Sequence, residues 1–223
     1  MFIDIHTHNS VFDPNIKKHF NYIVPTDFSE EFDLKNFNSS LVFSAGIHPW
    51  FINEIELKEQ YLYLRKVAYL SEVKIIGEAG LDKLKGSDFN IQEEIFIMQI
   101  RLAEEVQKPL IIHCVKSFAE MIAIKKVIKP KVPLILHGFN KKSELALELI
   151  GKGFYLSFGE ALLKSSSIQE ALKAVDLTKV FFETDSAACS IFEIYEKASQ
   201  VLHIDIDLLK KKIQENYLEL FIR

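Results

Sequence analysis

The chain has few of the residues that mark several special classes of protein. Its 223 residues include two cysteines, too few for a disulfide scaffold or a cysteine-ligated zinc site. Eight glycines and six prolines are too few for a disordered or fibrous chain. No apolar run approaches the roughly 18 residues that a membrane-spanning helix needs, and the first residues do not have the pattern of a secretory signal. We therefore expect a globular, cytoplasmic protein without a membrane partner.

Basic charge is not in excess either. The chain has 27 Lys and Arg against 31 Asp and Glu, a formal net charge of −4. Tight, sequence-independent binding to nucleic acid needs a clustered basic surface, so we expect no stable complex with nucleic acid. This balance still allows an enzyme that holds a phosphate group briefly.

The sequence does contain a regular alternation of short apolar runs and longer amphipathic stretches. The runs are mostly continuous and rich in β-branched and aromatic residues, as is typical of parallel strands covered by helices. They cover residues 2–6, 22–24, 41–47, 74–78, 109–113, 133–137, 153–158 and 179–185. No composition shift or linker divides the chain, so we expect one domain over residues 1–223.

The stretches between these runs carry the spacing and the start signals of helices. Apolar side chains between residues 91 and 106 fall on one helical face, with Asn90 as a candidate cap. Residues 56–70 and 207–221 predict two further helices. Capping-box spacing occurs in three pairs, Ser117 with Glu120, Ser167 with Glu170, and Ser190 with Glu193.

Strand and helix alternate along the chain, so the predicted fold class is α/β. An open doubly wound sheet and a closed eight-stranded barrel both have this alternation. A nucleotide-binding open sheet would carry a glycine-rich loop after its first strand, and none is present. Eight strands favour a (β/α)8 TIM-type barrel of the metallo-hydrolase variety. Its first βα units are abbreviated, because only residues 7–21 separate the first two predicted strands.

Five histidines and two carboxylates stand at predicted strand ends, where a barrel gathers its active site around one mouth. They are His6, His8, His48, Glu78, His113, His137 and Asp185. His6 and His8 are two residues apart on a strand, so both side chains point to the same side. Imidazole and carboxylate together suit divalent metals such as Zn, Mn, Fe, Co or Ni. The pattern therefore predicts a metal centre.

Four of the histidines and the two carboxylates together offer six ligands, which is more than one tetrahedral ion needs. They are His6, His8, His113, His137, Glu78 and Asp185. With a bridging carboxylate, six side chains can hold two ions about 3.5–4 Å apart, the arrangement used for hydrolysis at phosphorus. An oxygen of Asp185 is then a candidate to take or return the proton.

Motifs along nearly the whole chain carry a resemblance to a known family. They include Asp-x-His-x-His at residues 4–8, Ala-Gly-Ile-His-Pro at 45–49, Ile-Gly-Glu-Ala-Gly-Leu-Asp at 76–82 and Glu-Thr-Asp-Ser at 183–186. Together they resemble the TatD-type metal-dependent deoxyribonucleases, which are amidohydrolase-like metallo-barrels. The resemblance implies one ion on His6, His8 and Asp185, a second ion on His113 and His137, and Glu78 as the bridge. It also implies magnesium- or manganese-dependent nuclease activity, or hydrolysis of another ester bond.

The chain departs from the family pattern where substrate would bind. Val115 stands where the family has an arginine suited to phosphate, and Lys116 is the nearest replacement, as a point charge. His48 is a candidate donor to a phosphate or a leaving group, the alternative being a histidine that anchors its loop. Trp50 is a candidate for stacking on a base, the alternative being ordinary packing. Asp82 and Glu183 are candidates for orienting the ligands.

These observations predict a TatD-type metal-dependent hydrolase that cleaves phosphodiester bonds, a nuclease with two divalent ions among Mg, Mn, Zn, Co and Ni. The expected catalytic residues are Asp185, Glu78 and His48, and the expected substrate contacts are His48, Lys116 and Trp50. The substrate is a DNA end or a small phosphorylated molecule. An amidohydrolase or a PHP-type phosphoesterase remains an alternative, as does a non-catalytic metal-binding barrel.

Overall fold

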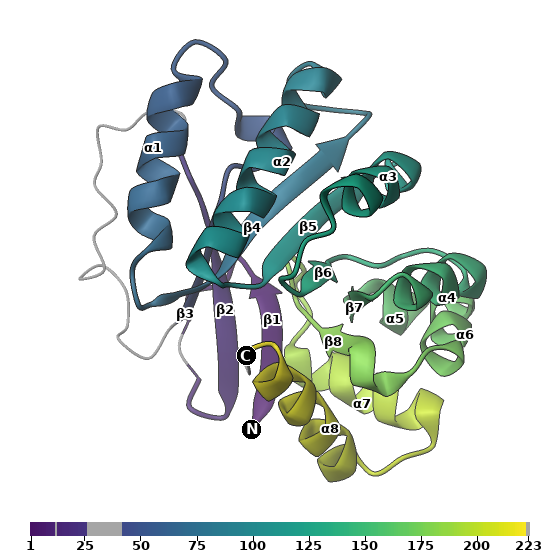
Figure 1. Cartoon of the computed structure of the whole chain (residues 1–223). Helices are drawn as coiled ribbons and strands as arrows, with labels where there is room; N and C mark the ends of the chain where they lie inside the picture. The colour runs from purple at the N-terminus through teal and green to yellow at the C-terminus, as the bar shows by residue number, and fades with distance from the viewer. Residues whose placement is uncertain (12, 26–41, 222–223) are drawn as a thin grey trace. The chain divides into compact units, whose positions relative to one another are not determined.

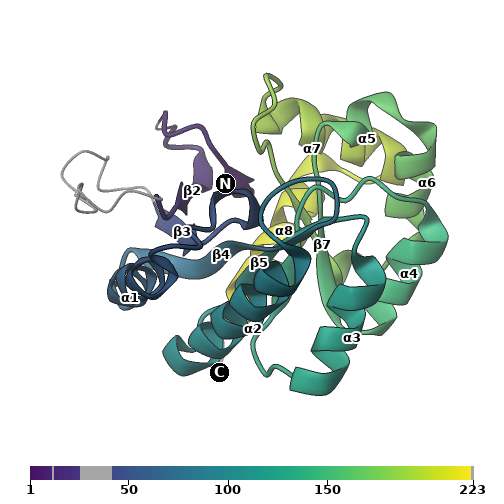
Figure 2. The same cartoon turned by 90° about the horizontal axis from the view of Figure 1, so that it is seen from above.

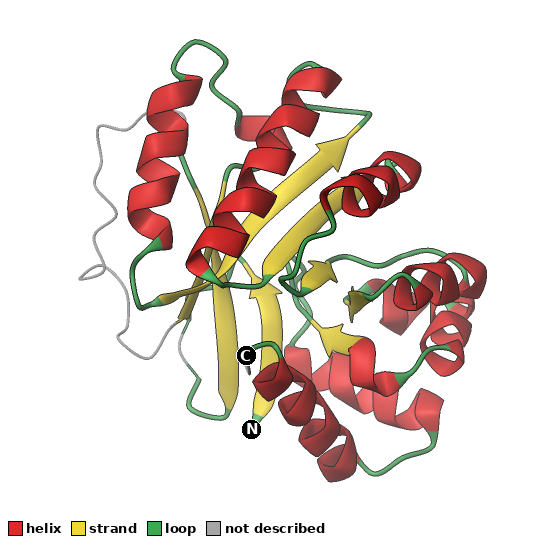
Figure 3. Cartoon of the chain, in the orientation of Figure 1, coloured by secondary structure: helices red, strands yellow, loops and turns green. Residues whose placement is uncertain are grey.

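The structure, a computed structural model, describes residues 1–11, 13–25 and 42–221 (Figure 1). The strands, yellow in Figure 3, are β1 (Phe2–Thr7), β2 (Ile16–Ile23), β3 (Val42–Gly46), β4 (Val73–Asp82), β5 (Leu110–Val115), β6 (Leu134–Leu136), β7 (Phe154–Phe158) and β8 (Val180–Phe182). The α-helices are α1 (Leu57–Ala68), α2 (Phe89–Val106), α3 (Phe118–Ile128), α4 (Ser143–Gly151), α5 (Ala161–Lys164), α6 (Ser166–Ala174), α7 (Ile191–Leu202) and α8 (Ile206–Glu219). Two short 3-10 helices are η2 (Pro49–Phe51) and η3 (Leu177–Lys179). None of the helices in the described ranges is long and apolar enough to cross a membrane.

Contacts divide the chain into two compact units. The terminal unit comprises Met1–Phe20 and Leu134–Arg223, and the central unit comprises Asn21–Pro133. The expectation of one domain over residues 1–223 stays a prediction.

In the central unit, β3, β4 and β5 are parallel neighbours, and α1 and α2 pack against β4 (Figures 1 and 2). Every residue of β4 from Ile75 to Asp82 is buried, as expected for a parallel strand that is covered on both faces. The predicted helix after β4 forms as α2, but its cap is Asp88, whose side chain accepts a hydrogen bond from the Asn90 N–H at 2.9 Å. The prediction of Asn90 as the cap is wrong by two residues.

In the terminal unit, β6, β7 and β8 are parallel neighbours, and β1 pairs with β2 in parallel. Helices α4, α5 and α6 form one group, seen together in Figure 2. β1 also lies beside the end of β8, since Thr7 forms a parallel bridge with Asp185. The strand order follows the chain. The Thr7–Asp185 bridge places the first strand beside the end of the last one, which distinguishes a (β/α)8 barrel from an open sheet.

The connection between β1 and β2 contains no helix in its described residues, 8–11 and 13–15. A parallel crossover usually takes a dozen or more residues and a helix. A strand of six residues is about 20 Å long, whereas eight extended residues span about 26 Å. A connection of eight residues is therefore long enough to reach the start of the next strand without a helix. The expected abbreviation of the first βα unit is confirmed for the described residues.

The second strand begins earlier than predicted. The apolar run predicted residues 22–24, whereas β2 covers Ile16–Ile23. The buried side chains on β2 are His19 and Asn21, which are polar, so no continuous apolar run marks the whole strand. His19 Nε2 is hydrogen-bonded to the Tyr217 hydroxyl at 2.9 Å.

The other strands lie within a few residues of their predicted ranges, although part of the third, at residue 41, lies outside the described residues. β4 continues four residues beyond its predicted end, so Glu78 lies inside the strand and not at its end. Of the three capping-box pairs, Ser190 with Glu193 is confirmed at the start of α7. Ser117 precedes α3 but makes no capping bond, because its hydroxyl donates to the Leu81 carbonyl at 2.9 Å. Ser167 lies inside α6.

Candidate metal centre

The end of β1 and the segment after β8 form the first group of metal-capable side chains, which we call the His6 cluster (His6, His8 and Asp185). One nitrogen or oxygen from each of the three lies within 4.8 Å of the others. Asp185 Oδ1 is 3.7 Å from His6 Nε2 and 3.5 Å from His8 Nε2. His6 is fully buried, whereas His8 and Asp185 are partly exposed. The cluster therefore has a buried side and a side open to solvent.

Backbone pairing fixes the position of Asp185 against β1. The Asp185 N–H donates to the His6 carbonyl at 3.0 Å, and the His8 N–H donates to the Asp185 carbonyl at 3.0 Å. Asp185 has a φ of 50°, a conformation that is uncommon for residues other than glycine and that often occurs at functional sites.

Asp4, the first residue of the Asp-x-His-x-His motif, ties β1 to the same segment. Its carboxylate accepts the Thr184 N–H at 3.0 Å and lies 2.7 Å from Thr184 Oγ1, which is also 2.8 Å from Thr7 Oγ1. Burial raises the pKa of Asp4 to about 7, against the hydrogen bonds from Thr184, which lower it. Asp4 therefore holds Thr184, the residue before Asp185, and is not one of the metal-capable residues of the cluster.

His137 follows β6 and lies against His6 in the terminal unit, with 4.4 Å between the ring centroids. Its Nδ1 is 3.4 Å from Glu183 Oε1, and the same oxygen accepts the Gly138 N–H at 2.5 Å. Glu183 is buried, so its carboxylate is well placed to orient the imidazole of His137. The structure thus gathers four of the six predicted ligands in the terminal unit.

The central unit holds the second group, which we call the Glu78 cluster (His48, Glu78 and His113). Glu78 Oε1 is 2.8 Å from His113 Nδ1 and 3.2 Å from His48 Nε2, and these two nitrogens are 3.3 Å apart. All three residues are buried. His48, predicted as a catalytic residue and a substrate contact, therefore lies within reach of the same ion as Glu78 and His113. The predicted pairing of His113 with His137 involves residues of different units and stays a prediction.

Asp82 supports the Glu78 cluster from the end of β4. Its Oδ2 is 3.1 Å from His113 Nε2, the nitrogen opposite the one that faces Glu78. Burial raises the pKa of the Asp82 carboxyl, but hydrogen bonds from the Leu84 N–H, Trp50 and His113 outweigh it and leave that pKa below its usual value. A carboxylate that accepts the second N–H of a metal-binding histidine fixes its tautomer and its orientation. This arrangement matches the role expected for Asp82.

Asn21 is the residue of this site that the sequence did not reveal. Its Oδ1 accepts the Glu78 N–H at 2.9 Å and the Ser44 hydroxyl at 3.1 Å, and its Nδ2 donates to Glu78 Oε2 at 3.2 Å. All three residues are buried. Asn21 therefore holds both the backbone and the carboxylate of Glu78. The only signal for Asn21 in the sequence is that polar residues occupy every second position of β2, at Lys17, His19 and Asn21.

The remaining predicted contacts are Trp50 and Lys116. Trp50 lies in η2, and its indole N–H donates to Asp82 Oδ2 at 2.7 Å. Lys116 is exposed directly after Val115, the last residue of β5, and has a φ of 53°. Trp50 is thus tied to the Glu78 cluster through Asp82, and the role of Lys116 as a substrate contact stays a prediction.

The donors fit divalent metal ions. Each cluster offers two imidazoles and one carboxylate, a combination common at zinc, iron and manganese sites. Beside the His6 cluster, buried Glu183 lies next to His137, and beside the Glu78 cluster, buried Asp82 contacts His113. An ordinary surface group of acidic residues has neither feature.

Known proteins are similar to this chain. A family model described as TatD related DNase matches residues 3–222. An uncharacterised metal-dependent hydrolase of Buchnera aphidicola is 35% identical over 196 residues, which are 82% of this chain and 72% of that protein. The uncharacterised metal-dependent hydrolase YcfH of Escherichia coli K12 is 32% identical over 158 residues, which are 69% of this chain and 58% of that protein. The chain thus spans less than two thirds of the length of YcfH.

Solved structures share the fold. The TatD homologue YJJV of Escherichia coli has a TM-score of 0.82 at 19% identity, over 99% of this chain and 97% of that chain. A TatD family hydrolase of Entamoeba histolytica has a TM-score of 0.81 at 19% identity, over 99% of this chain and 98% of that one. The predicted (β/α)8 TIM-type fold class is confirmed.

Proposed function

Because the chain belongs to the TatD related DNase family, whose relatives named above are metal-dependent hydrolases, we propose that it hydrolyses phosphodiester bonds with two divalent metal ions. The observation that carries the proposal is the presence of two clusters, each with two imidazoles and one carboxylate within 4.8 Å. His6, His8 and Asp185 would hold one ion, and Glu78 and His113 would hold the second. His137, beside His6, completes the six ligands.

The bound ions would supply Lewis acidity to the phosphoryl oxygens and would lower the pKa of the water that attacks phosphorus. The residues of the chain do the rest. Asp185 has a partly exposed carboxylate next to buried His6, so it can take a proton at one oxygen and return it to solvent. His48 is not one of these six ligands. Its Nδ1 accepts the Trp50 N–H, which leaves the ring proton on Nε2, 3.2 Å from Glu78 Oε1, and Nε2 can donate that proton to the leaving oxygen. Asp82 keeps the imidazole of His113 in one orientation while this happens.

The proposed substrate is a DNA end or a small phosphorylated molecule that is held transiently. The net charge of −4 and the presence of Val115 at the position of the family arginine favour these over a long duplex.

Metal content and a substrate panel, measured on one preparation, test the proposal. Purified protein is loaded with Mg, Mn, Co or Zn, analysed for metal, and incubated with single-stranded DNA, a phosphomonoester and an amide. We expect two ions per chain and cleavage of the DNA. Hydrolysis of the phosphomonoester or the amide alone would support the PHP-type or the amidohydrolase alternative. Bound metal with no hydrolysis of any substrate would support a non-catalytic barrel.

The Asp185→Asn variant separates catalysis from folding, because asparagine keeps the size of the side chain and removes its ability to take the proton. Asp207→Asn is the matched control, since Asp207 is an exposed carboxylate on α8 of the same unit. We expect cleavage to fall about a hundredfold in the first variant, the range of general acid–base contributions, and to stay unchanged in the second. Equal activity in both would exclude Asp185 as the proton acceptor.

A further inference from the structure

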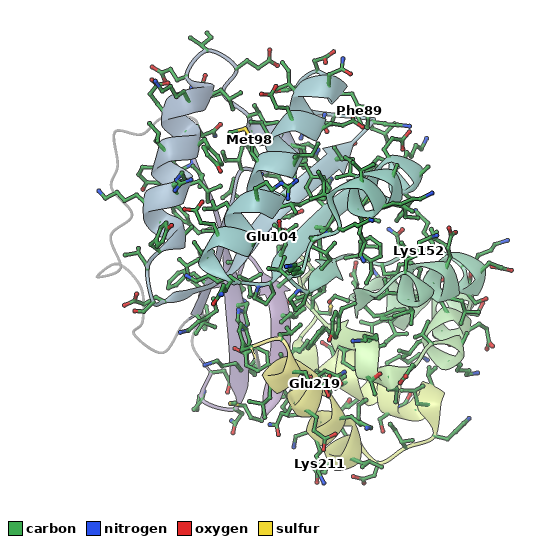
Figure 4. All side chains as sticks on the ribbon, viewed as in Figure 1. Phe89, Met98, Glu104, Lys152, Lys211 and Glu219 are labelled. Carbon is green, nitrogen blue, oxygen red and sulfur yellow. The ribbon has the colours of Figure 1, made fainter. Side chains whose placement is uncertain are left out.

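Helix α2 carries two buried glutamines, Gln92 and Gln99, on the side that packs against the sheet. They are seven residues apart, which is about two turns and about 10.5 Å along a helix, so their side chains lie on the same face. The course of α2 can be followed in Figure 4 from Phe89 to Glu104. Gln92 is 2% exposed and Gln99 is 0% exposed. Buried amides of this kind need hydrogen-bond partners, so the partners show what the two side chains do.

Each glutamine binds both backbone groups of a single residue. Gln99 Oε1 accepts the Ile47 N–H at 2.8 Å, and its Nε2 donates to the Ile47 carbonyl at 2.9 Å. Gln92 binds Asp82 in the same way, with its Oε1 accepting the Asp82 N–H at 2.7 Å and its Nε2 donating to the Asp82 carbonyl at 3.1 Å. Gln92 Nε2 also donates to the Ser87 carbonyl at 2.8 Å. Each carboxamide thus takes the place that the backbone of a neighbouring strand has in a sheet.

The two bound residues lie where the pairing of the strands stops. β3 ends at Gly46, directly before Ile47, and its register with β4 runs only as far as Ala45 with Ile76. Asp82 is the last residue of β4. Buried backbone groups need hydrogen-bond partners, and the amide end of glutamine offers one acceptor and one donor group. The glutamines therefore fix the backbone just beyond the regular sheet.

Gln99 acts on His48 through Ile47, the residue directly before it in the chain. His48 Nε2, the nitrogen that we propose as the proton donor, is 3.2 Å from Glu78 Oε1. A misplacement of about 1 Å in an active site can slow a reaction about a hundredfold. Gln99 is therefore placed to control proton donation without contacting the donor itself.

Gln92 acts on a different group, the carboxylate that orients His113. Asp82 Oδ2 is 3.1 Å from His113 Nε2, whereas Nδ1 of the same ring faces Glu78. Gln92 holds the backbone of Asp82 and closes the loop behind it onto α2. All of these residues belong to the central unit. Gln92 is therefore placed to control the binding of metal through His113.

We propose that Gln92 and Gln99 are positioning residues with separate roles, Gln92 for metal binding by His113 and Gln99 for proton donation by His48. The inference rests on the proposed function and assigns two further residues to it. Because the roles differ, loss of each glutamine changes a different measured quantity. A general loss of stability would change both quantities in both variants.

Gln92→Met and Gln99→Met test the metal-binding role. Methionine is similar to glutamine in length and has no amide, and each variant is the matched control of the other, since both positions are buried on the same helix with the same pair of bonds. Metal-free protein is titrated with Mn²⁺ in a calorimeter. We expect Gln92→Met to lose affinity about tenfold, the lower end for groups that orient a ligand. Gln99→Met should keep the affinity of the original chain, because His48 is not among the proposed ligands.

Two substrates with different leaving groups test the role in proton donation. Single-stranded DNA and bis(p-nitrophenyl) phosphate are compared in saturating Mn²⁺. The deoxyribose oxygen needs a proton to leave, whereas nitrophenolate leaves without one. We expect Gln99→Met to slow the cleavage of DNA about a hundredfold and to leave the cleavage of the nitrophenyl ester unchanged. Gln92→Met should cleave both substrates at nearly the original rate, because excess metal restores the bound ion.

Equal losses of metal affinity in the two variants would overturn the inference, as would equal slowing of the two substrates by Gln99→Met. Hydrogen exchange in the original chain gives a test that needs no variant to fold. The amides of Ile47 and Asp82 should exchange about as slowly as that of Ile76, which donates to the Pro109 carbonyl inside the sheet. Rapid exchange at either amide would also overturn the inference.

The proposed function fails separately. If the original chain cleaves neither phosphodiester, the proposed function is lost. Slow exchange of both amides and a loss of metal affinity confined to Gln92→Met would still support the positioning by α2. Cleavage of both phosphodiesters with rapid exchange at these amides would give the reverse result.

Discussion

Replacing Asn21 with alanine tests the best-defined support of the candidate metal centre. Asn21 makes three hydrogen bonds, two to Glu78 and one to Ser44, and all three residues are buried. Losing a partner costs a buried polar group about 1–3 kcal/mol. The backbone N–H and the carboxylate of Glu78 both lose this partner. We expect Asn21→Ala to lower the free energy of unfolding of the metal-free chain by about 2–5 kcal/mol.

The effect on metal affinity is the specific part of this prediction. Residues that orient a ligand typically change metal affinity by about 10–100-fold when they are removed. Asn21→Ala removes the hydrogen bond that holds Glu78 Oε2, so we expect a loss of this size in calorimetric titration with Mn²⁺ or Zn²⁺. Urea unfolding of the metal-free protein measures the change in the free energy of unfolding separately. The visible spectrum of the Co²⁺-loaded protein should also change, because the geometry of the carboxylate around the ion changes.

Ser44→Ala is the control, because Ser44 bonds to Asn21 and has no recorded hydrogen bond to Glu78 within the described residues. It should lose some stability and keep its metal affinity within about threefold. The reasoning is refuted if Asn21→Ala binds metal as tightly as the original chain, or if Ser44→Ala weakens binding equally. The first result would mean that Glu78 is held without Asn21. The second would mean that any damage to this part of the core has the same effect.

Three further predictions concern other parts of the chain. Asp185→Asn should reduce DNA cleavage about a hundredfold while circular dichroism shows an unchanged fold. Ser190→Ala removes one half of the capping box of α7 and should cost about 1 kcal/mol in thermal unfolding. Burial, with the nearby charge of Lys74 working against Glu72, lowers the pKa of Lys108 to about 8. The folded chain therefore binds fewer protons than the unfolded chain between about pH 8 and 10.5, so this lysine adds stability as pH rises through that window. Lys108→Met should remove this rise in urea unfolding measured at a series of pH values.

The sequence predicted the fold class and most strands because the relevant signals are local. Continuous apolar runs identify buried parallel strands such as β4 and β7, and the pair Ser190 and Glu193 identifies the start of α7. β2 was misplaced because its buried positions carry His19 and Asn21, whose partners are far away in the sequence. A strand that buries polar groups can be recognised only when those partners are known.

The same difference between local and distant signals applies to the candidate site. The histidines and carboxylates stand out in the sequence because their chemistry is rare at strand ends, and the structure gathers them into two clusters. Their orienting residues are less visible. Asn21 is an ordinary amide in the sequence, and Gln99 is one of several helix glutamines. Their roles depend on a 3.2 Å contact with Glu78 Oε2 and a 2.8 Å contact with the Ile47 N–H, which no local pattern encodes.

The discontinuous terminal unit has a consequence for the order in which the chain becomes structured during synthesis. β1 is made before the central unit, but Phe2 packs against Phe192 and Tyr195, and the Ile3 N–H donates to the Tyr195 hydroxyl. β1 is therefore without its covering helix until α7 has been made. The central unit is one continuous segment, so all of its residues are available together once Pro133 has been added. The Glu78 cluster can thus assemble on the growing chain before the terminal unit is complete, whereas the His6 cluster must wait until Asp185 has been added.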